Sequence, residues 1–312
     1  MNIKNTIRNL SPFNARQDMP ASQFVLKKLL AFFLIYLVAA VAGEAIIIGT
    51  LCAMGYDPLN GIMPTGFLAG LLPNYGMILF ISVAVIYCKK IEKFGLGKMG
   101  FCSRVFDYIL GGVLAMILLA VITAVGCACG VLTFGGVAAS FDMVQLLVLF
   151  GSFVIQSLSE EVLSRGFLFN ALRPKTGFAV AALVSSVAFM LPHLPSMLDG
   201  ETAFVVIGIV NLLLVSAVFT MLYALRGNIY IVSGLHCVWN FVLGGVMGLN
   251  LSGGSGSSNA VLNFTVGGAN LLTGGAYGLE ASVITTAILS VAVAILVKCY
   301  QKRGMKHVIF SE

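Results

Sequence analysis

Residues 144–165 read VQLLVLFGSFVIQSLSEEVLSR, an apolar run that ends in two adjacent carboxylates and, four residues later, an arginine. Ionisable side chains are costly in hydrocarbon, by about 2.5–3.5 kcal/mol each on insertion scales, so membrane helices usually keep them for a specific purpose. The stretch therefore predicts a membrane helix with a functional or structural cluster of charges near its end.

The composition extends this prediction to the whole chain. Hydrophobic residues make up 59% of the 312 residues and charged residues only 10%, whereas a soluble domain carries about 25% charged residues. Apolar runs recur from residue 29 to residue 297, which predicts a polytopic helical membrane protein without a second, soluble domain. The net charge of +6 does not indicate nucleic-acid binding, because the Lys and Arg residues lie beside the apolar runs, where they set topology.

The expected fold class is all-α, a polytopic transmembrane helical bundle of about eight spans. Residues 1–23 are expected to form a loose cytoplasmic polar arm and residues 301–312 a basic cytoplasmic tail, on either side of a transmembrane domain over 24–300 with its motifs at 140–250. The expected spans are roughly 29–51, 66–88, 106–131, 143–164, 178–193, 203–225, 229–249 and 281–299.

The basic residues predict the orientation of the spans. The alternate loops 52–65, 132–142, 194–202 and 250–280 contain no Lys or Arg. The positive-inside rule places these loops outside the cell and both chain ends in the cytoplasm. The loop 250–280 is rich in Gly, Ser and Asn, a composition that predicts a flexible external loop, which could gate access or simply connect two spans.

The charges that end the opening stretch divide into two roles. Glu161 and Arg165 are four residues apart, a spacing that places them on one helix face and predicts a structural ion pair. Glu160 is rotated by about 100° from Glu161 and does not share that partner. A carboxylate among apolar helices needs histidine or water beside it, which is the environment of a general base.

Two of the three histidines lie in or beside apolar spans. His193 follows Phe189 by four residues, and His236 precedes Asn240 by four, so His236 and Asn240 share a helix face. Histidine in a membrane helix normally faces the bundle interior, where each could equally form a helix–helix hydrogen bond. His307 lies in the basic tail and is expected to be solvated.

These clusters resemble the signature of the CAAX-protease and bacteriocin-processing (CPBP) family of intramembrane endopeptidases. That family shows EExxxR, FxxxH and HxxxN in this order on successive membrane segments. The three motifs stand here at residues 160–165, 189–193 and 236–240, and the resemblance covers about residues 140–250. Each motif alone is a weak signal, and their order and spacing make the combination specific.

The resemblance implies a glutamate-dependent peptide hydrolase within the membrane. By motif position, Glu160 would activate a water molecule and His193 would help to hold it. His236 and Asn240 would donate hydrogen bonds to the developing oxyanion. The neighbouring Glu–Arg pair would brace the site.

The same motif residues are compatible with either a metal-free or a zinc-dependent reaction. Members of the family have also been described as metalloproteases, and Glu160, His193 and His236 could hold zinc with an open position for water. The HExxH pattern is absent, and the seven scattered cysteines contain no CxxC pair, which argues against a structural zinc site. The metal-free reaction is the favoured expectation, with zinc as the alternative.

The substrate is expected to be a membrane-associated peptide or protein, and no nucleic acid is expected as a partner. The eukaryotic branch of the family cleaves prenylated C-terminal tripeptides, whereas bacterial relatives are linked to peptide processing, bacteriocin immunity and signalling. The short arm, the absence of an organellar transit peptide and the positive-inside pattern suit a multi-pass protein of a bacterial plasma membrane. Prenylated substrates are then not expected.

Two hypotheses without proteolysis use the same residues. One is a non-catalytic bacteriocin-immunity or peptide-binding membrane protein. The other is a proton-coupled transporter, since Glu and His also form proton relays, although no inverted repeat is visible in the sequence. Glu44, in the first span, is expected to snorkel or to pair helices, with a place on a substrate path as the alternative.

Overall fold

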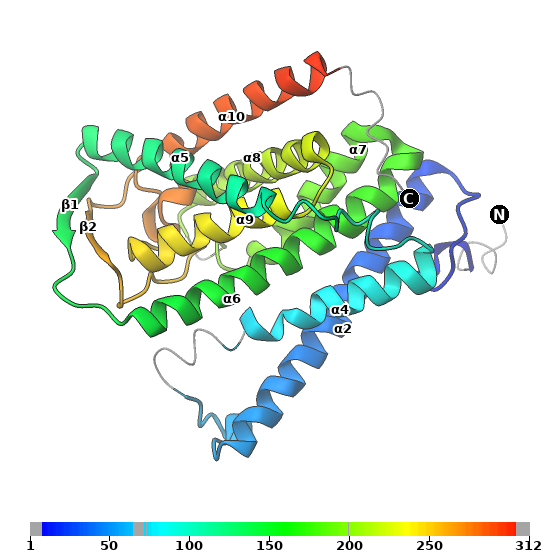
Figure 1. Ribbon diagram of the computed structural model, residues 1–312, viewed down its shortest axis with the longest axis horizontal. Helices are drawn as coiled ribbons and strands as arrows, with labels where there is room; N and C mark the ends of the chain where they lie inside the picture. The colour runs from blue at the N-terminus through cyan, green and yellow to red at the C-terminus, as the bar shows by residue number, and fades with distance from the viewer. Residues whose placement is uncertain (1–7, 65–71, 73, 199, 304–312) are drawn as a thin grey trace. The chain divides into compact units, whose positions relative to one another are not determined.

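The computed structural model describes residues 8–64, 72, 74–198 and 200–303 (Figure 1). Within these residues, six helices are long and apolar enough to cross a membrane, which confirms the predicted all-α polytopic class. The helices cover Ala21–Ala53, Asn74–Glu92, Asp107–Ala128, Met143–His193, Thr202–Arg226 and Val283–Lys302, and a shorter apolar helix covers Tyr230–Val246.

Some sequence predictions fall on other parts of the chain. The first seven residues of the arm, the start of the predicted span 66–88, and residues 304–312 with His307 lie outside the described residues. The count of eight spans and their orientation stay predictions.

Three α-helices pass directly into π-helical segments. The α-helices are α2 (Ala21–Ala53), α4 (Ile78–Tyr87), α5 (Asp107–Ala128), α6 (Met143–Glu161), α7 (Asn170–Met190), α8 (Thr202–Arg226), α9 (Tyr230–Asn240) and α10 (Val283–Lys302). The π-helical segments are η2 (Cys88–Glu92) after α4, η3 (Val162–Phe169) after α6 and η5 (Phe241–Val246) after α9. Short 3-10 helices are η1 (Pro58–Asn60), η4 (Leu191–His193), η6 (Gly275–Tyr277) and η7 (Leu279–Ala281).

The chain divides into two compact units. Over the described residues, unit 1 lies within residues 8–102 and 155–185, and unit 2 lies within residues 103–154 and 186–303. The EExxxR motif therefore belongs to unit 1, and the FxxxH and HxxxN motifs belong to unit 2.

In unit 1, α2 begins earlier than the predicted span, at Ala21, and so includes two buried lysines. Lys27 Nζ donates to Asn14 Oδ1 and to the carbonyl oxygen of Arg16, each at 2.8 Å. Lys28 forms an ion pair with Glu92 of η2. A buried ammonium group is costly unless it is paired, so these contacts hold this part of the predicted loose arm, and η2, against α2.

The helix α7 is broken at Gly177, where φ is 80° and ψ is 174°. A residue with a Cβ atom is strained at this positive φ, whereas glycine, which lacks a Cβ atom, adopts it without strain. Pro174, three residues earlier, also disfavours a continuous helix. The break lies between the two predicted spans 143–164 and 178–193, as the sequence indicated.

In unit 2, α5 packs along α9 with backbone against backbone (Figure 1). A Cβ atom added at Gly111 would lie 2.0 Å from the carbonyl oxygen of Ile231, and one added at Gly234 would lie 2.0 Å from that of Tyr108. Small residues allow membrane helices to approach this closely, where packing rather than hydrophobic transfer drives association. The pair of glycines thus sets the position of α9, the helix that carries HxxxN.

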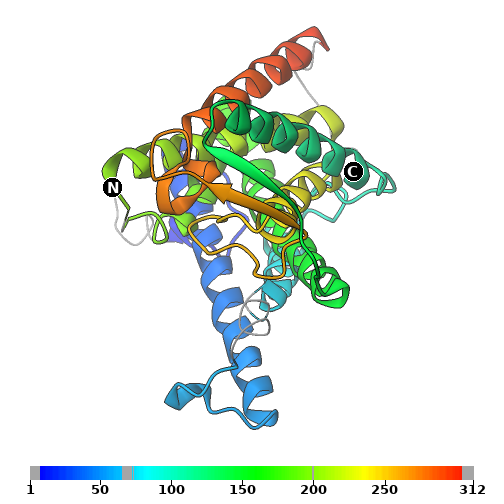
Figure 2. The same cartoon turned by 90° about the vertical axis from the view of Figure 1, so that its left-hand side faces the viewer.

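Two strands form an antiparallel pair in unit 2, which the sequence analysis did not predict (Figure 2). Leu132 pairs with Val266 and Phe134 with Phe264, within β1 (Leu132–Val137) and β2 (Leu262–Val266). The segment LNFTV has the alternation and the aromatic and β-branched residues of a strand. The expectation that the whole loop 250–280 is flexible was therefore wrong.

The glycine contact between α5 and α9 predicts a marked effect of Gly234→Ala. The new methyl group would overlap a backbone oxygen, so we expect the free energy of unfolding to fall by at least ~2 kcal/mol, measured by unfolding of the detergent-solubilised protein. The matched control is Gly49→Ala in α2, where nothing lies within 4 Å of the added Cβ and alanine is the better helix former. Equal stability of the two variants would contradict the close approach.

Candidate active site

The first motif lies in unit 1, at the junction where α6 ends and η3 begins. Glu160 is partly exposed, and Gln156 Nε2 donates to Glu160 Oε1 at 3.3 Å. The π-helical segment starts two residues later, at Val162. π-Helical turns are rare and are found frequently at functional sites, because their wider turn re-aims the side chains that follow.

The predicted ion pair of Glu161 and Arg165 is present and completely buried. Arg165 Nη1 lies 3.0 Å from Glu161 Oε2 and 3.1 Å from Oε1, and both side chains have 0% exposure. A buried pair of this kind is strongly destabilised when one partner is lost, because the other charge then stays in a medium of low dielectric constant. The pair therefore fixes the start of η3 directly beside Glu160.

Two polar side chains fasten this segment to the rest of unit 1. Ser159 Oγ donates to the carbonyl oxygen of Met77, just before α4, at 2.8 Å. Asn170 Nδ2 donates to the carbonyl oxygen of Lys98 at 2.7 Å. The motif is thus held at both ends by hydrogen bonds to backbone carbonyls.

In unit 2, the two histidine motifs come together around one phenylalanine ring. The ring of Phe189 lies 5.1 Å from the ring of His193 and 5.9 Å from the ring of His236, measured between centroids. Phe219 of α8 stacks on His236 at 5.1 Å with an interplanar angle of 27°. Aromatic pairs at these distances are in contact, so FxxxH and HxxxN form a single cluster.

A hydrogen bond fixes the tautomer of His193. Its Nδ1 atom lies 3.0 Å from the carbonyl oxygen of Phe189, within the same motif. A carbonyl oxygen can only accept, so Nδ1 carries the proton and Nε2 is the acceptor nitrogen of the neutral ring. Phe189 therefore contacts the imidazole of His193 with its ring and accepts a hydrogen bond from it with its backbone carbonyl oxygen.

The HxxxN residues lie on the last turns of α9. His236 is 6% exposed and Asn240 is 5% exposed. The helix ends at Asn240, and η5 begins at the next residue. As in the first motif, the change to a π-helix occurs directly beside the candidate catalytic side chain.

The structure describes the two groups of motif residues separately, since they belong to different units. It brings His193 and His236 together in unit 2 and pairs Glu161 with Arg165 in unit 1. The meeting of Glu160 with the two histidines stays a prediction. Over its described residues, neither unit holds three His, Cys, Asp or Glu side chains grouped to bind a metal.

One residue of this region escaped the sequence analysis. Trp239, inside the HxxxN motif, donates from Nε1 to Glu280 Oε1 at 3.0 Å. The sequence held a signal for this contact, because Glu280 is the single charged residue between residues 250 and 297. An isolated carboxylate at the edge of an apolar span is expected to have a specific partner.

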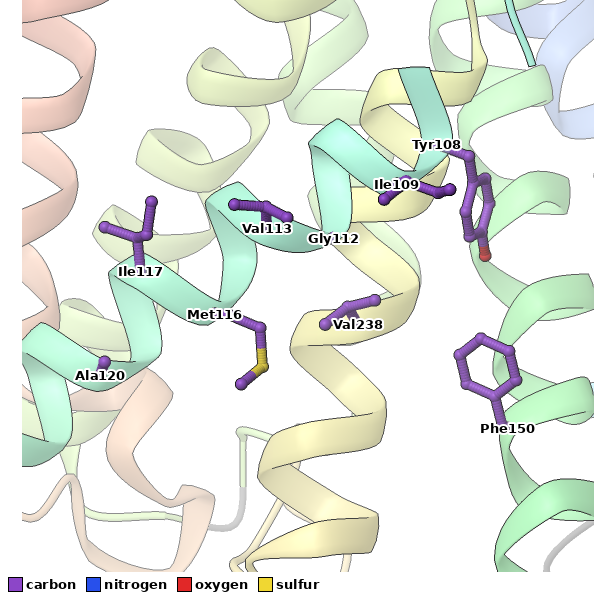
Figure 3. Close-up of a pocket in the computed structure, with 9 residues that line it drawn as sticks. All are labelled: Tyr108, Ile109, Gly112, Val113, Met116, Ile117, Ala120, Phe150 and Val238. Atoms are coloured by element: carbon purple, nitrogen blue, oxygen red, sulfur yellow. The ribbon is translucent and has the colours of Figure 1, made fainter. Parts of the chain in front are cut away.

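An apolar groove of unit 2 runs beside α5 (Figure 3). It has a volume of about 570 Å³ and runs along α5, with one wall residue from α6 and one from α9. His193, His236 and Asn240 do not line it, whereas Val238 of the HxxxN motif does. Its lining is Tyr108, Ile109, Gly112, Val113, Met116, Ile117, Ala120, Phe150 and Val238.

Comparison with known protein families relates part of the chain to a family of peptidases. Residues 142–242 match the model of the type II CAAX prenyl endopeptidase Rce1-like family. The matched range contains all three motifs, which confirms the resemblance stated from the sequence. A search of curated proteins found no match to the chain.

The buried ion pair predicts a non-additive pair of substitutions. Arg165→Met alone leaves the Glu161 carboxylate buried without its cation and should lower the free energy of unfolding by about 3–5 kcal/mol. Glu161→Gln combined with Arg165→Met should restore much of that loss, because no charge is then left buried. Unfolding of the solubilised variants measures both effects.

The control for these substitutions is Lys90→Met, which removes an exposed cation of unit 1 and should change stability by no more than about 0.5 kcal/mol. A double variant whose loss equals the sum of the two single losses would show that the pairing is not what stabilises the segment.

Proposed function

We propose that this chain, whose residues 142–242 match the Rce1-like family, is a CAAX-protease-like, glutamate-dependent intramembrane endopeptidase of the CPBP family. The family and the six apolar helices make it a multi-pass membrane protein of the CAAX-protease type, whose partners are the lipid bilayer and a peptide or protein substrate. The observation that carries the proposal is the packing of His193 and His236 on one phenylalanine ring, which joins two motifs in one cluster.

In the proposed reaction, Glu160 takes a proton from a water molecule. Nε2 of His193 accepts a hydrogen bond that holds this water, and its ring orientation is set by the bond from Nδ1 to the Phe189 carbonyl oxygen. The water oxygen forms a bond to the peptide carbonyl carbon. Glu160 then delivers the proton to the leaving nitrogen as the C–N bond breaks.

His236 and Asn240 are the proposed donors to the oxyanion that develops on the carbonyl oxygen. Both side chains are more than nine-tenths buried, and fixed donors in a site of low dielectric constant stabilise such a charge by several kcal/mol. The stacking of Phe219 on His236 supports this role, because it restricts the direction in which the imidazole can donate.

The proposed location is the plasma membrane of a bacterium. It rests on the restriction of Lys and Arg to alternate loops of the sequence. The proposed substrate is a membrane-associated peptide or protein rather than a prenylated C-terminal tripeptide.

Zinc remains the alternative to metal-free chemistry. Its proposed ligands are Glu160, His193 and His236, which are donors of the type that zinc takes in catalytic sites. The bond from His193 Nδ1 to a carbonyl oxygen is also the arrangement that orients zinc-binding histidines. A bound zinc would polarise the substrate carbonyl and activate water.

Glu160→Gln tests the proposed base. The amide cannot take a proton from water, so we expect turnover to fall by about 10²–10⁴-fold, the usual contribution of a positioned general base, with folding retained. Comparison of peptides from cells that carry the wild type or the variant identifies the substrate, and kinetics in proteoliposomes then measure the loss.

The matched control is Glu44→Gln, which removes an exposed carboxylate from α2 and should leave turnover unchanged. Unchanged cleavage by a folded Glu160→Gln protein would reject the base. Protection against a bacteriocin that persists when Glu160, His193 and His236 are all replaced would favour the binding-protein alternative over the peptidase.

Treatment with chelators tests the metal. The metal-free reaction predicts that activity in proteoliposomes is unchanged after EDTA or phenanthroline and after dialysis. Loss of activity that zinc restores, and that magnesium or calcium does not restore, would overturn this expectation and support the zinc alternative.

A further inference from the structure

Glu280 uses both of its carboxylate oxygens within unit 2. Oε1 accepts from the indole Nε1 of Trp239 at 3.0 Å, and Oε2 accepts from the backbone N of Ser252 at 2.6 Å and from its Oγ at 3.2 Å. All three partners are donors, which matches an ionised carboxylate, an acceptor only. The contact joins residues 41 positions apart in the chain.

The backbone that carries Glu280 is itself fixed by α8. Asn211, 3% exposed, donates from Nδ2 to the carbonyl oxygens of Glu280 at 2.7 Å and Ser282 at 2.9 Å. Its Oδ1 accepts from Thr286 Oγ1 at 2.7 Å. The carboxylate is therefore presented to Trp239 from a rigid position rather than from a mobile loop.

The turn that precedes Glu280 contains two glycines with positive φ, Gly274 and Gly278. Gly278 has a φ of 95°, and a Cβ there would lie 2.6 Å from the carbonyl oxygen of Asn250. Gly274 has a φ of 76°, and a Cβ there would lie 2.0 Å from the carbonyl oxygen of Gly278. Only glycine fits both the backbone angle and the close approach, so this end of the predicted flexible loop has a defined conformation.

We propose that Glu280 is a positioning residue of the peptidase site, acting on His236 and Asn240 through Trp239. Trp239 follows His236 by three residues and directly precedes Asn240. Residues three apart are neighbours on a helix, so the bond to Glu280 fixes the rotation of α9 about its axis at the point where η5 begins. This inference rests on the proposed oxyanion role of His236 and Asn240.

Replacing Glu280 by glutamine keeps the volume of the side chain and changes only its charge and its hydrogen-bonding groups. Glutamine has nearly the shape of glutamate but only one acceptor oxygen, so its NH₂ group must face either the Trp239 indole N–H or the Ser252 backbone N–H. In a Trp239→Phe background the glutamine can turn its oxygen to Ser252 and meet no second donor at the ring. Glu280→Gln should therefore be harmful with tryptophan present and nearly neutral without it.

The test measures steady-state kinetics, thermal unfolding and tryptophan fluorescence of the full-length protein in proteoliposomes. Trp239 is the single tryptophan of the chain, so its emission reports directly on this contact. For Glu280→Gln we expect a shifted emission maximum and a fall in kcat of about 10- to 100-fold, the rate equivalent of one lost hydrogen bond to a charged group. KM should stay near the wild-type value, and the unfolding temperature should fall by only a few degrees, because one hydrogen bond of the folded state is lost.

The matched control is Glu201→Gln, an exposed carboxylate at the start of α8, for which wild-type kinetics and emission are expected. Trp239→Phe should lower kcat as Glu280→Gln does, and the double variant should lower it no further. Wild-type kcat in Trp239→Phe, or independent losses that multiply in the double variant, would overturn the proposal. Because Trp239→Phe retains an aromatic ring, its kcat alone tests the positioning role if Glu280→Gln does not fold.

The outcome separates this inference from the proposed base. Full activity of Glu160→Gln would reject the base, whereas the emission shift and the coupling between Glu280 and Trp239 would still be measurable. If kcat falls in Glu160→Gln but is unchanged in Glu280→Gln, the positioning role of Glu280 is rejected and the proposed base is retained.

Discussion

The cost of holding a charge among apolar helices is the constraint on which the rest of this structure depends. Among the described residues, the buried charges of Lys27, Lys28, Glu161 and Arg165 each have a polar partner within hydrogen-bonding distance. Arg165 binds Glu161 beside the candidate base, and Lys28 binds Glu92 at the end of η2. Glu280 meets this requirement with neutral donors. The exact pairing matters because an unpaired buried charge costs more than most packing contacts contribute.

The second feature is the position of the π-helical segments. In two of the three motif-bearing helices the α-helix gives way to a π-helix within two residues of a candidate catalytic residue, after Glu161 in α6 and after Asn240 in α9. The third, α7, passes into the 3-10 helix η4. A change to a π-helix leaves backbone groups in a non-standard register and is stable only where surrounding contacts hold it. The buried Arg165 supplies those contacts in unit 1, and the glycine contact at Gly234 together with Glu280 supplies them in unit 2.

Local patterns were predicted well, and contacts between distant segments were not. The spacing of Glu161 and Arg165 predicted their ion pair, and the family signature identified the motifs that the Rce1-like match contains. The β1–β2 pair, the burial of Lys27 and the partner of Glu280 were all missed. Each of these depends on residues far apart in the chain, whereas helix spacing and hydropathy report only on neighbours.

By itself, the sequence determined the all-α membrane class, the order of the three motifs and the pairing of Glu161 with Arg165. These follow from hydropathy, from the helix repeat and from the motif spacing, all of which are local. Only the tertiary structure decided that His193 and His236 share the ring of Phe189. The physical reason is that membrane helices are apolar on nearly every face, so their periodicity does not mark the face that turns inward; close backbone contacts and paired polar side chains decide it instead.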